Sequence, residues 1–327
     1  MSLLPAQQAI TGHPQDSPTD GSGNAAPFGV FTNGSVAESH VQILVPKDEL
    51  PAAGAILTGM ELSALIGGTV NYAQLTITVR PVTLTSLSLV FANNNLGPAT
   101  TVLAATSLQK TWATSAWTPL PFTNVYVHDG VSALLVEIQK VVAPTSGGGG
   151  SSGGGSTFPF VTQTIAFPER IDRPQMVYVF GGPGSGGATN PAAFASAQPI
   201  SFRLDWLNAP TFRQRSDYLG PVLDYGLGNT LELTVDGNPG DVYATMLANS
   251  FLPTAIPVPG IGGSVRIAAL NVWNSGFVDA AGHGGQTIVI PVDPTLVGAH
   301  LAWQAVTLGA FSGALTLTNG SDHFVNP

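Results

Sequence analysis

The chain has 327 residues, of which 44% are hydrophobic and only 9% are charged. This length corresponds to about two domains, and the apolar content is enough to bury a core. The formal net charge is −9, and only 10 residues are Lys or Arg. These numbers exclude a solvated disordered chain, a coiled coil and a nucleic-acid binder, because phosphate contacts need clustered Lys and Arg. The chain has no cysteine, which excludes disulfide bonds and thiolate sites.

Residues 1–27 are polar and rich in Gly, Pro and Ser, and they lack the basic start and apolar stretch of a signal peptide. We expect an extended N-terminal arm. We favour a loose terminus over an arm that docks, because chain ends are loose unless something ties them down. The most apolar long window, residues 50–70, contains Pro51, Glu61 and several glycines, so we expect no transmembrane segment.

Residues 28–210 show the period-two alternation of β-strands. Leu75, Ile77 and Val79 alternate with polar residues, and residues 134–138 and 176–180 are typical of more central strands. We predict an all-β, jelly-roll-like β-sandwich for this block. Residues 146–156 read SGGGGSSGGGS, which is the composition of a flexible linker. They lie between two predicted strands, so we expect a flexible loop inside the domain.

Residues 218–327 form a second β-rich block. Leu231, Leu233 and Val235 alternate with polar residues, and similar runs recur up to Leu315 and Leu317. Turn pairs such as Asp-Gly and Asn-Gly separate these runs. About seven strands in roughly 105 residues is the size of a β-sandwich, so we predict an Ig-like or Greek-key sandwich as the C-terminal domain.

The C-terminal block carries several turn-and-strand signatures. They are the runs at 231–237, 257–263, 290–298 (I-P-x-D-P-x-L-x-G), 302–305 and 315–319 (L-T-L-T-N). Together they resemble the C-terminal module of secreted two-module β-sandwich proteins of planctomycete-type bacteria, and the first block looks like the jelly-roll-like module that often precedes it. The resemblance implies an exported, surface or extracellular protein, and its motifs are structural, with no known catalytic residues.

The sequence shows little sign of catalytic chemistry. Residues 182–187 match G-x-G-x-x-G, but no helical periodicity follows to hold a pyrophosphate, so we interpret them as a loop between strands. The six histidines show no metal-binding spacing, and no G-x-S-x-G motif is present. We predict that the protein is not an enzyme, and calcium is the one cofactor that we consider.

Two groups of residues are candidate ligand sites. Asp236, Asn238 and Asp241 form a short acidic turn whose oxygen atoms have a spacing that suits calcium, with a plain turn as the alternative. Trp112 and Trp117 lie in the polar segment TWATSAWT, and two large aromatic rings could stack on a sugar. Packing in a core or an interface is the alternative for both tryptophans.

These observations favour a non-enzymatic extracellular or cell-surface protein with a structural or interaction role. Low charge and Thr- and Ser-rich strands suit lateral packing, so we expect the protein to bind copies of itself or an extracellular matrix or glycan, with edge strands as contact elements. A carbohydrate-binding or adhesive module is the alternative. A virion or tail component is a further alternative, and it would form a symmetric oligomer.

Overall fold

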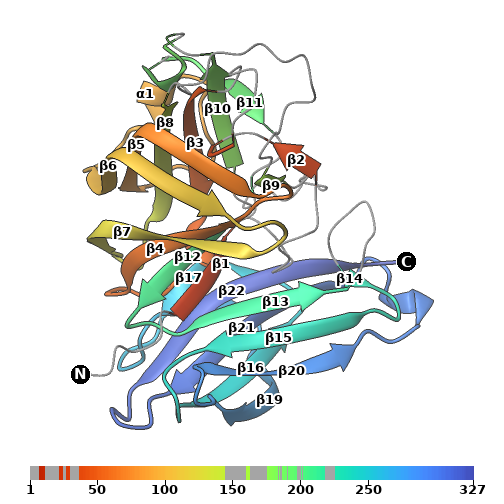
Figure 1. The fold of residues 1–327 in the computed structure, drawn as a ribbon. Helices are drawn as coiled ribbons and strands as arrows, with labels where there is room; N and C mark the ends of the chain where they lie inside the picture. Colours follow the sequence, from red (N-terminus) through yellow and green to blue (C-terminus); the bar gives the residue numbers. More distant parts are fainter. Residues whose placement is uncertain are drawn as a thin grey trace.

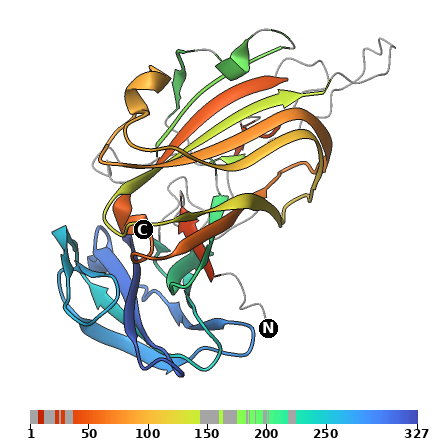
Figure 2. The ribbon, with the colours of Figure 1, turned by 90° about the vertical axis from the view of Figure 1, so that its left-hand side faces the viewer.

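The computed structural model consists of two β-sandwich domains, one above the other in Figures 1 and 2. The structure describes residues 7–11, 22–24, 27–29, 37–143, 160–162, 175–182, 184, 186–189, 191–196, 200, 202–217 and 225–327. Within these ranges the one α-helix is a single turn, α1 (Phe91–Asn94). The predicted all-β fold class is therefore confirmed. The Gly/Ser-rich segment 146–156 lies outside the described residues.

The N-terminal domain packs a four-stranded sheet against a six-stranded sheet. The first sheet has the order β1 (Gln7–Thr11), β12 (Phe202–Leu207), β4 (Ile56–Ser63), β7 (Trp117–Val127). The second has the order β11 (Phe194–Ser196), β10 (Gln175–Gly181), β3 (Glu38–Val45), β8 (Ala133–Val142), β5 (Gly68–Val82), β6 (Thr100–Trp112).

The connectivity of these strands is that of a jelly roll. In chain order the eight main strands are β1, β3 to β8 and β12. One sheet joins the first, eighth, third and sixth of them, and the other joins the second, seventh, fourth and fifth, all antiparallel. This is the double Greek-key pattern of a jelly roll. Strands β10 and β11 extend the second sheet beyond β3.

The first strand of the jelly roll comes from the segment that we expected to be a loose arm. Residues Gln7 to Thr11 pair with β12 from Trp206 to Phe202. A second short strand, β2 (Ser22–Asn24), pairs with β9 (Phe160–Thr162). The expectation of a loose terminus is therefore wrong for these residues. The physical reason is that β12 would otherwise leave a row of unpaired N–H and C=O groups at the sheet edge.

The C-terminal domain is an Ig-like sandwich. Its three-stranded sheet has the order β13 (Thr211–Ser216), β15 (Thr230–Asp236), β20 (His283–Val289). Its five-stranded sheet has the order β14 (Tyr225–Gly226), β22 (Leu315–Asn326), β21 (His300–Leu308), β16 (Val242–Ala248), β19 (Asn271–Phe277). Apart from the two-residue β14, these are seven strands arranged as in Ig-like sandwiches. Strand β13 belongs to this domain, so the domain begins at Thr211 and not at 218.

A hairpin inserted into the second domain joins it to the first. The hairpin is formed by β17 (Phe251–Pro257) and β18 (Ser264–Ile267). Arg266 on β18 is buried, and its guanidinium donates hydrogen bonds to the carbonyl oxygens of Lys47, at 2.6 Å, and Leu50, at 3.1 Å. Lys47 is the first residue of the short 3₁₀ helix η1 (Lys47–Glu49), and Leu50 follows its last residue. This contact fixes one point of the junction between the domains.

Candidate functional site

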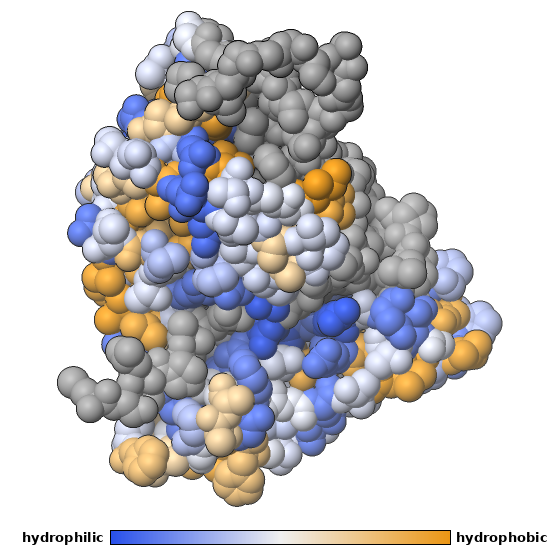
Figure 3. All heavy atoms as spheres, viewed as in Figure 1, coloured by the Kyte–Doolittle hydropathy of each residue, from blue (hydrophilic) through white to orange (hydrophobic). Residues whose placement is uncertain are grey.

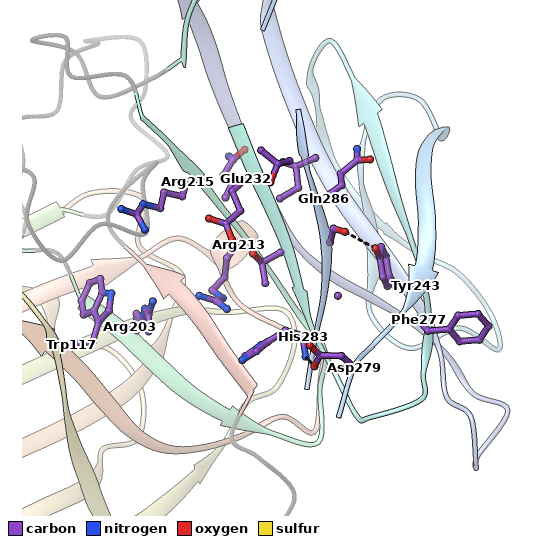
Figure 4. A pocket seen from close by; sticks show the side chains of 16 residues that line it. Trp117, Arg203, Arg213, Arg215, Glu232, Tyr243, Phe277, Asp279, His283 and Gln286 are labelled. Carbon is purple, nitrogen blue, oxygen red and sulfur yellow. Dashed lines mark hydrogen bonds between the residues drawn. The ribbon is translucent and has the colours of Figure 1, made fainter. Parts of the chain in front are cut away.

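A groove of about 660 Å³ lies where the two domains meet (Figure 4). The C-terminal domain supplies its three-stranded sheet, and the N-terminal domain supplies the ends of β7 and β12. Figure 3 shows hydrophilic surface along this boundary. We call this site the junction groove and define it by the following lining residues: Trp117, Arg203, Arg213, Arg215, Glu232, Thr234, Asp279, His283, Gly285 and Thr287.

The register of the three-stranded sheet places these side chains in rows. Alternate residues of a strand point to the same face, so Arg213 and Arg215 share one face of β13. Arg213 is opposite Thr234, which is opposite Gly285. Arg215 is opposite Glu232, which is opposite Thr287. A β-carbon at Gly285 would lie 1.9 Å from the carbonyl oxygen of Leu233, so only glycine fits there, and the floor of the groove stays open.

A buried carboxylate holds the C-terminal wall of the groove in place. Asp236 accepts hydrogen bonds from Arg213 Nε at 2.5 Å and Nη2 at 2.9 Å, and its Oδ1 lies 2.7 Å from His283 Nδ1. Burial raises the pKa of Asp236, but the charge of Arg213 and the bond to His283 outweigh it and lower the pKa below its ordinary value. The same bond to Asp236 raises the pKa of His283.

A second ion pair holds the N-terminal wall. Arg203 Nη1 lies 2.9 Å from Glu61 Oε2, and the guanidinium carbon lies 4.4 Å from the centre of the Trp117 ring. Strand pairing places Arg203 directly opposite Glu61. The Trp117 side chain is half-buried, and its Nε1 has no hydrogen-bond partner among the described residues. The groove therefore has an aromatic wall fixed by an ion pair, with the Trp117 Nε1 atom buried behind it.

The charges around the groove nearly cancel. Arg203 and Arg213 are paired with Glu61 and Asp236, whereas Arg215 makes no hydrogen bond or ion pair with any residue that the structure describes. Glu232 and Asp279 add two further carboxylates to the lining. Such a lining offers many hydrogen-bond donors and acceptors side by side, but no large excess of one charge.

The structure does not bring the two candidate tryptophans together as a platform. Trp112 is only 1% exposed, its Nε1 donates to the hydroxyl of Tyr72 at 2.9 Å, and its ring lies 5.2 Å from that of Phe28. It belongs to the jelly-roll core, so no sugar can stack on it, and the sugar-stacking prediction is wrong for Trp112. The physical reason is that Trp112 ends β6 with its side chain on the inner face of the sandwich. Trp117, by contrast, lines the junction groove.

The two aspartates of the predicted calcium turn are also engaged in separate sets of hydrogen bonds. Asp236 is committed to Arg213 and His283. Asp241 is buried as well; its Oδ2 accepts the backbone N–H of Asn238 at 3.2 Å and its Oδ1 accepts that of Ala310 at 3.0 Å. N–H donors thus occupy the carboxylate oxygens that calcium would need. This corrects the calcium hypothesis. The described ranges also contain no group of three or more His, Asp or Glu that could hold a metal.

Sequence reasoning missed the arginines of the groove. Five arginines lie between 170 and 215 with acidic residues interspersed, and this spacing gives no local sign that some of them meet in a groove. The period-two spacing of Arg213 and Arg215 is the one local signal that both face the same side. Arg203 is on a different domain, so only the fold brings it near them.

Comparison with models of known protein families finds no match for this chain, and comparison with curated proteins finds none either. In the part of the chain that the structure describes, no helix is long and apolar enough to cross a membrane. The protein thus combines a jelly roll and an Ig-like sandwich with a polar, charge-balanced groove between them.

Proposed function

We propose that this protein is a non-enzymatic structural subunit of an extracellular or cell-surface assembly, and that it binds further copies of itself through its C-terminal domain. The observation that carries the proposal is a row of exposed apolar side chains across four neighbouring strands. Phe277, Val242, Leu308 and Leu315 are direct cross-strand partners in turn. All four are exposed. Phe311, in the turn between β21 and β22, extends this apolar row and is 94% exposed.

The apolar row lies on the outer face of the five-stranded sheet. Tyr243, next to Val242 on β16, points into the sandwich core, so Val242 points outward. The inserted hairpin covers the other half of this face and packs on Met246, Ala302 and Leu317. The apolar row is the uncovered continuation of that packed surface. In Figure 3, apolar side chains gather at the end of the domain where the β21–β22 turn lies.

The size of the apolar row suits the centre of a protein interface. A fully exposed aromatic side chain offers about 150–250 Å², so Phe277 and Phe311 alone present on the order of 300 Å². A stable interface uses about 800 Å² from each partner, with an apolar centre and a polar rim. The lysines of the chain lie at 47, 110 and 140, all in the first domain, so no lysine of the C-terminal domain opposes the approach of a second copy.

The edge strand β19, which carries Phe277 of the apolar row, is also suited to contact a second copy of the chain. Strand β19 lies at the end of its sheet and contains neither proline nor a charged residue. By contrast, the edge strand β7 contains Pro119 and Pro121, and β6 contains Lys110, which are devices that discourage strand addition. A bulge interrupts the pairing of β19 at Trp273, which leaves 274–277 as the regular stretch beside the apolar row.

The proposal is tested by the mass of the protein in solution. Val272 on β19 is 66% exposed, and Val272→Lys adds a charge to the edge. We expect the wild type to sediment as an oligomer or assembly and Val272→Lys to shift towards the 33.5 kDa monomer. Val131→Lys is the matched control, because Val131 is 76% exposed on the first domain. A wild type that stays monomeric, or a Val272→Lys variant that assembles like the wild type, would contradict the proposal.

A further inference from the structure

We propose that the junction groove is a binding site for a neutral oligosaccharide. Its volume of about 660 Å³ lies within the usual range of about 300–1,000 Å³ for ligand sites, and domain interfaces are a common place for them. The inference is independent of self-assembly. Phe277 belongs to the apolar row and also borders the groove, but Figure 4 shows that its side chain points away from Trp117 and the arginines.

The charge balance selects a neutral ligand over an ionic one. A phosphate or sulfate would have to compete with Glu61 for Arg203 and with Asp236 for Arg213, and it would meet Glu232 and Asp279 as well. A cationic ligand would meet the guanidinium groups. A hydroxyl group both donates and accepts a hydrogen bond, so it fits a wall on which guanidinium donors and carboxylate acceptors alternate.

The groove also retains unused hydrogen-bonding groups. Arg215 and Glu232 are opposite each other and exposed, and neither has a hydrogen-bond partner in the described part of the chain. The hydroxyls of Thr234 and Thr287 face the same space and are likewise unpaired among the described residues. Together they supply donors and acceptors along the C-terminal wall. Several adjacent hydroxyls of one sugar chain could be bound at once.

The aromatic wall supplies the apolar part of the contact. Sugar rings carry C–H groups on their faces, and a tryptophan ring can pack against such a surface. Trp117 is held by the Arg203 guanidinium, which is itself held by Glu61. Both walls are thus fixed before a ligand arrives, which reduces the entropy cost of binding.

Calorimetric titration with defined sugars tests the site. The probes are cellohexaose, xylohexaose, mannohexaose and chitohexaose, with a hexagalacturonate and a heparin hexasaccharide as anionic comparisons. We expect at least one neutral hexasaccharide to bind and the anionic ones to bind more weakly. Arg215→Ala and Trp117→Ala should each raise its Kd tenfold or more. Arg213 is not used as a variant because its loss would leave Asp236 buried without its cation.

Val131→Ser is the matched control and should leave the Kd unchanged, because Val131 is on a distant exposed loop of the same domain as Trp117. The titration is repeated on Val272→Lys, so that the result does not depend on assembly. Preference for the anionic sugars, binding of no neutral probe, or unchanged affinity in both groove variants would overturn the inference.

Discussion

The two sandwiches bury their apolar side chains to different extents. The jelly roll gathers its largest side chains, including Trp112, Trp206 and Phe202, into one main core, with two smaller apolar clusters around Leu135 and Phe91. The Ig-like sandwich divides its buried apolar residues between an inner core around Trp303 and an outer cluster beneath the inserted hairpin. It also leaves large apolar residues such as Phe311, Phe277 and Val272 in solvent. The jelly roll exposes apolar residues too, such as Val125 and Val131, but the most exposed phenylalanine among its described residues, Phe180, is 39% exposed, against 94% for Phe311. The second domain therefore offers the larger aromatic surface to a partner.

The two domains also differ in how their charged groups are buried. Lys140 is fully buried in the jelly roll, and burial lowers its pKa to about 7. In the second domain, Asp236 is buried beside Arg213 and His283, which keep it ionised. Burial lowers the pKa of Lys140 even though its Nζ donates a hydrogen bond to the carbonyl oxygen of Gly29, whereas Arg213 and His283 lower the pKa of Asp236 despite its burial. The domains should therefore respond differently to pH and to substitution.

The largest expected effect separates two tryptophans of similar size. Trp112→Ala leaves a cavity in the jelly-roll core and should lower the free energy of unfolding by about 3–5 kcal/mol. Trp273→Ala in the second domain removes a half-exposed ring that makes an edge-to-face contact with Trp303, and it should cost clearly less because about half of the ring is already in solvent. Urea unfolding of both variants measures the difference. Equal losses would contradict the comparison of the two cores.

Next in size is the pH dependence that Lys140 imposes on the jelly roll. Its folded pKa lies below its unfolded value, so the unfolded chain binds more protons between these values and stability rises with pH. Between pH 8 and pH 10 the slope from this group is about 1.4 kcal/mol per pH unit at most. Lys140→Met should remove that slope in urea unfolding series. A variant with the wild-type slope would show that Lys140 is not the titrating group.

The contact between the domains should contribute a smaller amount. Arg266→Met removes two hydrogen bonds from a buried guanidinium to backbone carbonyls, which should cost about 1.5–3 kcal/mol. Because these bonds join the domains, we expect calorimetry to show wider separation between the unfolding of the two sandwiches. A single transition that moves as a unit would indicate that other contacts dominate the junction.

The smallest effect belongs to His283. Its folded pKa is raised, so the stability that it adds is fully present below its unfolded pKa and is lost as pH rises through the folded pKa. The side chain is 52% exposed, so solvent screening reduces the effect to on the order of 0.5 kcal/mol. Between pH 6 and pH 8.5, the free energy of unfolding of His283→Gln should fall by less than that of the wild type. The opposite sign would contradict the Asp236–His283 pairing.

Local patterns predicted the strands but not their partners. The alternation of Leu75, Ile77 and Val79 corresponds to β5, and that of Leu231, Leu233 and Val235 corresponds to β15. Period-two burial is a local property, so the sequence carries it directly. The pairing of β1 with β12 joins residues nearly 200 positions apart, and no local signal distinguishes such a strand from a loose terminus.

The junction groove was harder to predict for the same reason. Trp117, Arg203 and Arg215 come from three strands in two domains, and only the fold brings them together. Trp112 and Trp117 are five residues apart and look alike in sequence, yet one ends a strand inside the core and the other begins a strand beside the groove. Which side of a strand end faces solvent depends on tertiary packing.

The claim that the second domain alone provides the assembly surface is tested most directly by hydrogen–deuterium exchange of the wild type at low and high protein concentration. We predict that protection rises with concentration in peptides covering β19 and the β21–β22 turn, while peptides from the jelly roll exchange at the same rate throughout. Exchange that is independent of concentration, or protection that rises in the jelly roll and not at β19, would contradict it.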